Sequence, residues 1–456
     1  MLPLLLALLM PTDTRAQHDT EAPVFAAPAE APADSVRHPG ESRRRRKAKR
    51  RAPPEIDDAS QPDVPLVSQP DPVRGVHVTG WAAGSPKFRS RMIRDLKDAG
   101  LNAVVIALKE YDGKVFVRGV PLAREIGACA NAIPDLPACV ADFRRAGIRA
   151  IGRIVLFKDN ILARKRTEWA VKTPNGDVWR NERGIAWVDP YRRETWDYNL
   201  AIASRAAAAG FDEIQFDYVR FPSDGNTRLC RYSRADHSPK TAVANIREFL
   251  VQARRSLDPF GARISICLFG MTSSAQGDMG IGQSIAELAE EVDAVYPMMY
   301  PSHYRKGELG VKNPNREPFR IIRRSVRDAV LRLGPNAGKL RPYFQDFSLG
   351  VRYDAEKVRA QLLAAQRFGV TSWVLWNPKN KYTWSALRHN NRFVWEEPTP
   401  STAAAPAANV IPEGPPGRSG SALVPFPSLT GRDSPARRDD RAPAQDSPKA
   451  DVKENP

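Results

Sequence analysis

The chain has 456 residues, a formal net charge of +17, 40 prolines, 4 cysteines and 6 histidines. So few cysteines, with no Cys-x-x-Cys pair and no ligand-spaced histidines, exclude a disulfide-rich scaffold and a structural zinc protein. Much of the positive charge lies in Arg43 to Arg51, where eight of nine residues are Arg or Lys. The high net charge therefore comes largely from one short run and does not indicate that the whole chain binds nucleic acid.

The first ten residues are nearly all Leu, Ala and Met, and a polar stretch ending in Thr14-Arg15-Ala16 follows. This apolar run is too short to span a bilayer, and the small residues Thr14 and Ala16 suit signal-peptidase cleavage before Gln17. We expect residues 1–16 to be a signal peptide and the protein to be exported, either to the periplasm or out of the cell.

Residues 17–71 and 397–456 are rich in Pro, Ala and charged residues and poor in aromatic residues. Such segments bury too little apolar surface to offset the entropy of ordering, so we predict two disordered extensions. In an exported protein, the basic run of the first extension suits an anionic membrane face or an acidic wall polymer. Non-specific nucleic-acid binding and a spacer without a partner are the alternatives; we expect no specific nucleic-acid partner.

Between residues 72 and 396, short apolar strands alternate with amphipathic helices. We expect strands at 74–79, 102–108, 148–157, within 210–222, and at 263–269, 294–299, 340–344 and 372–375. Helices are expected at 85–98, 140–146, 191–209, 240–256, 282–291, 319–333, 355–368 and from Thr383. This order predicts an α/β protein with one (β/α)8 barrel, the TIM barrel. An open doubly wound sheet alternates similarly, but the strands number eight and no Gly-rich dinucleotide fingerprint follows the first strand, so no such cofactor is expected.

Cys129 and Cys139 flank a short loop-like segment. In an oxidising compartment we predict that they form a disulfide, which would add about 2 to 3 kcal/mol of stability through the unfolded state. Cys267 lies within an apolar strand, where a thiol is usually buried as a small hydrophobic group.

The segment Gly210 to Pro222 alternates Ile214 and Phe216 with Gln215 and Asp217. This period of two places successive side chains on opposite faces of a strand, with Asp217 at its carboxyl end. The other expected strands also end in polar or aromatic groups. These are His77, Lys109, Glu110, Arg153, Tyr218, Tyr300, His303, Gln345, Asp346, Trp376 and Asn377. A barrel gathers such groups at one mouth, although each could instead cap a helix or satisfy loop backbone.

Four motifs carry a family resemblance: Gly-Phe-Asp-Glu-Ile-Gln-Phe-Asp-Tyr-Val-Arg-Phe-Pro at 210–222, Tyr-Pro-Met-Met-Tyr-Pro-Ser-His-Tyr at 296–304, Gln-Asp-Phe at 345–347 and Leu-Trp-Asn at 375–377. With them, residues 72–396 resemble exported glycoside hydrolases with a TIM-barrel domain of unknown function, the DUF4015 type. The resemblance implies a (β/α)8 barrel, an unidentified polysaccharide substrate, and Asp217 as the best-placed catalytic carboxylate.

The chain departs from the pattern of that family at two strand ends. After the second strand, Ala107 and Glu110 stand where the resemblance leads us to expect two Asp residues, and Cys267 stands where the fifth strand would carry Asp. If a missing Asp is catalytic in relatives, this protein is impaired. A non-catalytic carbohydrate-binding protein and a cell-envelope scaffold are therefore the alternatives to an enzyme.

Glycosidases of the common kind use two carboxyl groups, one protonated and one ionised. We expect Asp217 to be the ionised group, with Arg220 or Lys109 as the cation next to it, and Asp346, ranked before Glu110, to be the acid. Tyr218, Tyr300 and Trp376 would stack on sugar rings. Hydroxyls or charged substituents would be bound by His77, Arg153, His303, Gln345 and Asn377. The basic groups favour an acidic sugar, and no metal or cofactor is expected.

Overall fold

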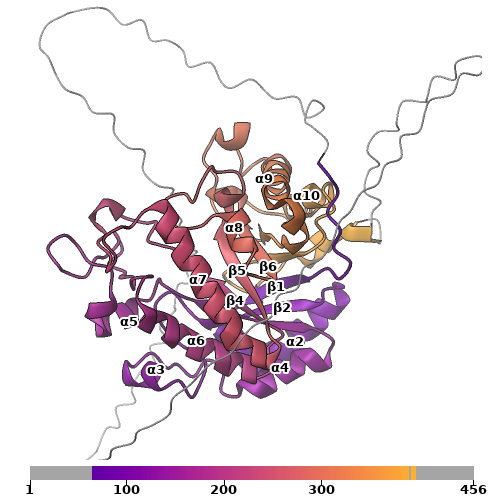
Figure 1. Cartoon of the computed structure of the whole chain (residues 1–456). Coiled ribbons are helices and arrows are strands. Elements are labelled where there is room, and N and C mark those ends of the chain that lie inside the picture. The colour runs from indigo at the N-terminus through magenta and orange to yellow at the C-terminus, as the bar shows by residue number, and fades with distance from the viewer. Residues whose placement is uncertain (1–63, 390–391, 397–456) are drawn as a thin grey trace, which may run out of the picture. The chain divides into compact units, whose positions relative to one another are not determined.

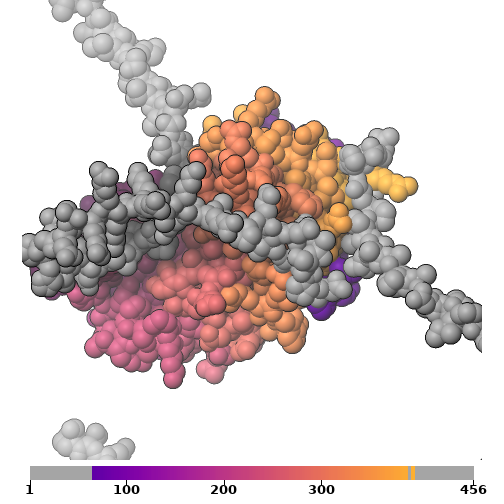
Figure 2. Space-filling view, turned by 90° about the horizontal axis from the view of Figure 1, so that it is seen from above, coloured from indigo at the N-terminus to yellow at the C-terminus, as the bar shows by residue number. Residues whose placement is uncertain are grey.

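The computed structural model describes residues 64–389 and 392–396, and their core is a closed barrel of eight parallel strands (Figure 1). β1 pairs with β2 and also with β8, which closes the sheet. In Figure 2, a small indigo area of the N-terminal part lies beside the orange area of the C-terminal part. The barrel strands are β1 (Arg74–Val78), β2 (Ala103–Lys109), β3 (Arg149–Val155), β4 (Glu213–Asp217), β5 (Arg263–Phe269), β6 (Ala294–Met299), β7 (Tyr343–Gln345) and β8 (Trp373–Trp376).

Helices connect the strands and surround the barrel (Figure 1), so the predicted TIM-barrel class is confirmed. They are α1 (Gly80–Gly84), α2 (Pro86–Asp98), α3 (Pro121–Glu125), α4 (Leu136–Arg145), α5 (Asn160–Lys165), α6 (Arg193–Ala208), α7 (Pro239–Leu257), α8 (Ile285–Ala289), α9 (Pro318–Leu333) and α10 (Ala355–Gln366). The helix predicted from Thr383 is wrong: a 3-10 turn at Trp384–Leu387 leads into the two short antiparallel strands β9 (Arg388–His389) and β10 (Arg392–Phe393). Within the described residues, no helix has the length and apolarity needed to cross a membrane.

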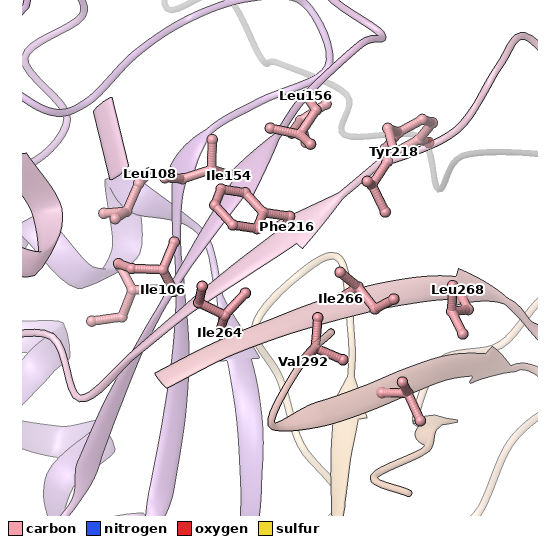
Figure 3. Close-up of a cluster of buried hydrophobic side chains, with 14 of the residues drawn as sticks. Ile106, Leu108, Ile154, Leu156, Phe216, Tyr218, Ile264, Ile266, Leu268 and Val292 are labelled. Carbon is pink, nitrogen blue, oxygen red and sulfur yellow. The ribbon is translucent and has the colours of Figure 1, made fainter. Parts of the chain in front are cut away.

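The period of two in β4 separates two environments. Ile214 and Phe216 belong to the apolar layer between the strands and the helices, which Figure 3 shows with matching side chains from β2, β3 and β5. In the barrel interior, Glu213 and Gln215 bond to residues of β6 and β7, and Asp217 bonds to Arg153 of the neighbouring β3. The apolar layer packs the helices against the strands. Inside the barrel, these polar groups lie among a second set of buried apolar residues, including Val105, Ile151 and Val374.

The polar side chains in the interior lie at successive heights along the barrel axis. Glu213 accepts hydrogen bonds from the Tyr296 hydroxyl at 2.9 Å and from Arg341 at 2.8 Å. One level towards the carboxyl ends of the strands, the Tyr343 hydroxyl donates to the Gln215 side-chain oxygen at 2.7 Å. Asp217 lies at the next level, at the end of β4. The hydrogen bonds of Glu213 and Gln215 thus hold the side chains below Asp217 in place, although the Gln215 amide nitrogen has no hydrogen-bond partner in the described part of the chain.

The folded part begins before residue 72, the boundary predicted for the first extension. Gln69 donates to the carbonyl oxygens of Leu340 at 2.7 Å and Gly338 at 3.1 Å, and its side-chain oxygen accepts from the backbone of Thr371 and Ser372, both at 2.8 Å. Residues 64–71 are thus part of the barrel structure. The predicted signal peptide, the basic run and the predicted C-terminal extension lie outside the described residues.

Candidate active site

A narrow pocket opens at the carboxyl ends of the strands, where a TIM barrel places its active site. Every barrel strand except β2 contributes a lining residue or the residue that follows the strand. The lining consists of His77, Arg153, Asp217, Tyr218, Cys267, Met298, Tyr300, Tyr343 and Trp376. The prediction that polar and aromatic strand ends meet at one mouth therefore holds for His77, Arg153, Asp217, Tyr218, Tyr300 and Trp376.

Arg153 joins two carboxyl groups at this mouth. Its Nε and Nη2 donate to one oxygen of Asp217 at 2.8 and 2.6 Å, and its Nη1 lies 3.4 Å from Glu110 Oε2. The other Asp217 oxygen accepts the Tyr218 backbone N–H at 2.6 Å. Burial raises the pKa of Glu110, while the adjacent Arg153 acts in the opposite direction. Asp217 and Glu110 thus share one cation. Asp217 lines the pocket, whereas Glu110, the residue after β2, lies outside the lining and meets the pocket only through Arg153.

The cation beside Asp217 was predicted to be Arg220 or Lys109, and the structure corrects this to Arg153. The Lys109 ammonium is fully buried, 2.7 Å from an Asp159 oxygen, and donates to Asn199 of α6 at 2.8 Å and to the Val155 carbonyl at 2.9 Å. A register shift in the β2–β3 pairing between Ala107 and Lys109 accompanies this placement. Lys109 therefore links β2, β3 and α6 and lies outside the pocket.

Tyr218 has a backbone φ of +50°, which residues other than glycine rarely adopt. The Arg220 guanidinium lies 4.8 Å from the centre of its ring, and the Lys158 ammonium lies 5.2 Å from it. Lys158 also forms an ion pair with Asp224 at 3.1 Å. Arg220 thus packs against an aromatic residue of the pocket rather than against Asp217. Backbone strain beside a pocket is typical of functional sites.

An aromatic cluster forms one wall of the mouth. Tyr300 stacks on Trp376 with ring centroids 5.4 Å apart, and Phe347 meets Trp376 edge-on at 5.0 Å. His303 contacts Tyr300 at 5.3 Å and so lies in this cluster, outside the pocket lining. Sequence reasoning missed Met298, Tyr343 and Phe347. The period of two would have found Tyr343, two residues before Gln345 on β7, whereas Phe347 lies in a loop and carried no such signal.

Three predicted site residues instead fix loops. The two Asp346 carboxylate oxygens accept from the Thr383 backbone N–H at 2.7 Å and the Thr383 hydroxyl at 2.6 Å. Gln345 accepts from the Ser302 backbone at 3.0 Å, and Asn377 donates to the Asp346 carbonyl. Burial raises the pKa of Asp346 to about 6. All three lie outside the pocket lining, so the raised pKa of Asp346 reflects a buried loop anchor.

His77 and Cys267 both line the pocket. His77 is 4% exposed, and neither ring nitrogen has a hydrogen-bond partner in the described part of the chain. Burial, reinforced by Arg153, lowers the pKa of His77 well below its usual value, so the ring is neutral. Burial likewise raises the pKa of the Cys267 thiol. A neutral imidazole can donate one hydrogen bond and accept another, as binding a sugar hydroxyl requires.

The structure contradicts the predicted Cys129–Cys139 disulfide, because both thiols are free. Cys139 lies on the buried side of α4, with its sulfur 3.5 Å from the Ala83 carbonyl, whereas Cys129 is exposed and bridges by its backbone to Val115. Spacing in sequence did not reveal that the two side chains point into different environments. In the described ranges, no group of three or more His, Cys, Asp or Glu residues could hold a metal ion.

A closed (β/α)8 barrel with a pair of carboxyl groups and an aromatic wall at its carboxyl mouth defines a glycosidase-like TIM-barrel protein. The family model described as "Putative glycosyl hydrolase domain" (DUF4015) matches residues 75–382, and the chain belongs to this family. The resemblance found in the motifs is thereby confirmed.

Solved structures that match the chain include a hypothetical protein from Ruminiclostridium thermocellum ATCC 27405, at 35% identity and a TM-score of 0.39, covering 42% of this chain and 96% of that one. The PgaB (BpsB) glycoside hydrolase domain from Bordetella bronchiseptica matches at 14% identity and a TM-score of 0.49, covering 68% of this chain and 94% of that one. The α-L-fucosidase isoenzyme 2 from Paenibacillus thiaminolyticus matches at 13% identity and a TM-score of 0.47, covering 69% and 48%. A comparison with curated proteins finds no match.

Proposed function

We propose that this protein is a glycoside hydrolase that cleaves a bacterial envelope or extracellular polysaccharide with Asp217 and Glu110. The observation that carries the proposal is that Arg153 joins two carboxyl groups, at 2.6 Å from Asp217, which lines the pocket, and 3.4 Å from Glu110, which lies beside it. Membership of the glycosyl hydrolase family supports the reaction class. Export to the periplasm or the medium, as the leader-like first 16 residues predict, would bring the enzyme to such a polymer.

Glu110 takes the role of the acid, in place of Asp346. Burial raises its pKa, and its side chain is 26% exposed, so it can hold a proton and reach a substrate. Both oxygens of Asp346 are already bonded to Thr383. In the proposed reaction, Glu110 protonates the glycosidic oxygen as the bond from this oxygen to the anomeric carbon breaks, and water completes the hydrolysis.

Asp217 takes the role of the ionised carboxylate. It either attacks the anomeric carbon, which retains the configuration, or takes a proton from the attacking water, which inverts it. Arg153 pairs with the charged form and fixes the orientation of the carboxylate. The neutral ring of His77 would bind a sugar hydroxyl, and Trp376 with Tyr300 would offer an aromatic wall to the apolar face of the sugar.

The test is incubation of the full chain with an array of bacterial envelope polysaccharides, with new reducing ends as the readout. We expect cleavage of at least one polymer and its loss in Asp217→Asn, which keeps the shape of the side chain and removes its charge. Asp212→Asn is the matched control, because Asp212 precedes the same strand and bonds the Ala150 backbone away from the pocket. Full activity of Asp217→Asn on a cleaved polymer would exclude the proposed mechanism.

A second candidate is a carbohydrate-binding protein without turnover. Ala107 and Cys267, which stand where the resemblance leads us to expect Asp, favour this candidate, and so does the full engagement of Asp217 by Arg153 and the Tyr218 backbone. It predicts saccharide binding with no product in the same array. A cell-envelope scaffold held by the basic run Arg43 to Arg51 predicts instead that deletion of that run, and not Asp217→Asn, abolishes association with the envelope.

A further inference from the structure

Trp81, just after β1, is the most exposed large hydrophobic side chain in the described part of the chain, at 61%. It lies on α1, and its ring meets the buried ring of Phe116 edge-on, with centroids 6.1 Å apart. A single exposed hydrophobic residue is ordinary on a protein surface. Trp81 differs from such residues because close contacts anchor both ends of the short helix that carries it.

Two glycines seat α1 directly on the barrel. A Cβ on Gly80 would collide with the Phe116 ring and lie 2.9 Å from the Ala107 carbonyl oxygen, and a Cβ on Gly84 would collide with the Ala132 carbonyl oxygen. Thr79 caps the helix by accepting from the Ala82 backbone N–H. The close approach at both ends restricts shifts of α1, so the backbone that carries the exposed indole is held in place.

Trp81 is also linked to the wall of the pocket. Asn380, in the loop after β8, accepts from the Thr79 backbone at 3.0 Å and donates to the Thr79 hydroxyl at 3.2 Å. The same β8 segment provides Trp376 of the pocket, and β1 provides His77. Four residues separate His77 from Trp81, so their Cα atoms are at most about 14 Å apart. That distance is within the span of a short oligosaccharide.

We propose that Trp81 is a stacking platform for a sugar ring outside the pocket, and that the substrate is therefore a glycan chain occupying several positions rather than a single terminal sugar. The inference deepens the proposed function and rests on it for the class of ligand. A flat, exposed ring on an anchored backbone suits the apolar face of a sugar, because it offers a large contact area and only two side-chain torsions have to be fixed on binding.

The test measures binding rather than hydrolysis. Full-length chain carrying Asp217→Asn is run in native gels that contain hydroxyethyl cellulose, glycol chitin or polygalacturonate, which are neutral, N-acetylated and acidic polymers. Trp81→Ala and Trp81→Phe are added to the same background. Phe260→Ala is the matched control, because Phe260 is an aromatic residue 45% exposed in the turn that leads into β5, at the opposite end of the barrel.

We expect at least one polymer to retard the Asp217→Asn protein and Trp81→Ala to raise its dissociation constant about fivefold to tenfold. Trp81→Phe should restore most of the retardation, and Phe260→Ala should change nothing. Three outcomes would each overturn the proposal. They are retardation by none of the polymers, equal retardation with and without Trp81, and a dimer that dissociates on Trp81→Ala. Failure of the proposed function is seen separately, as undiminished release of reducing ends by Asp217→Asn.

Discussion

Asp346 is the carboxyl group whose replacement should change how the stability of the barrel depends on pH. It is 3% exposed, and burial raises its pKa from 3.8 to about 6 in the folded protein. In the unfolded chain, Asp346 ionises near its ordinary value, whereas in the folded protein it stays protonated until about pH 6. The free energy of unfolding therefore falls as pH rises from about 4 to 6, and it is constant with respect to this group above that range.

The size of the effect follows from the shift. One pKa unit corresponds to about 1.4 kcal/mol, so the ionised Asp346 lowers the free energy of unfolding by about 3 kcal/mol at pH 7. Asparagine imitates the protonated carboxyl. Its side-chain oxygen can accept the Thr383 backbone N–H, and its amide can donate to the Thr383 hydroxyl, which are the two groups that Asp346 contacts. Asp346→Asn should thus match the wild type near pH 4 and be about 3 kcal/mol more stable at pH 7.

Urea unfolding followed by tryptophan fluorescence between pH 4 and 7.5 would measure this difference. Asp354→Asn is the control with the opposite sign, because the Lys357 backbone N–H lowers the pKa of Asp354 at the start of α10. Its loss should reduce stability increasingly as pH rises through the range below 4, with little further change above it. The raised pKa of Asp346 would be refuted if the difference in the free energy of unfolding between Asp346→Asn and the wild type did not vary with pH.

Three further outcomes are expected. Glu110→Gln should lower polysaccharide cleavage about 100-fold or more and spare an activated aryl glycoside, whose leaving group needs no proton; equal losses on both substrates would remove Glu110 as the acid. Lys109→Met should cost about 3 to 5 kcal/mol in urea unfolding, because Asp159 would stay buried without its cation; a change below 1 kcal/mol would contradict this. Under native conditions, iodoacetamide followed by mass spectrometry should modify Cys129 and not Cys139, and a bonded pair would restore the predicted disulfide.

The sequence predicted the barrel well because the alternation of buried strand and amphipathic helix is a local pattern. The strands at 263–269 and 294–299 match β5 and β6 in full. The error at Thr383 is also local in origin: the apolar residues there belong to a 3-10 turn against α10, and the chain passes directly from this turn into β9 at Arg388. The period of two in β4 correctly separated Asp217 from Phe216, since only one face of a barrel strand is polar.

Side-chain partners could not be predicted in the same way. Arg153 and Asp217 lie 64 positions apart, and which cation reaches Asp217 depends on the register between β3 and β4. Lys109 stands at the end of its strand just as Asp217 does, yet the register shift there accompanies a side chain directed towards α6. A polar residue at a strand end therefore marks the correct edge of the barrel, but not whether its side chain lines the pocket or ties a loop.

The hydrogen bonds of Gln69 have a consequence for where the chain can be cut. β7 is the shortest barrel strand, with three residues, and shares only two register pairs with β6. The side-chain amide of Gln69, which lies outside the sheet, connects the starts of two strands by hydrogen bonds. It bonds Leu340 before β7 and also Thr371 and Ser372 before β8. A fragment that starts at residue 72 lacks these hydrogen bonds. Hydrogen exchange at the Thr371 and Ser372 amides should therefore become faster, which would show that the barrel opens first between β7 and β8. Fragments for crystallisation or binding studies should begin no later than residue 64.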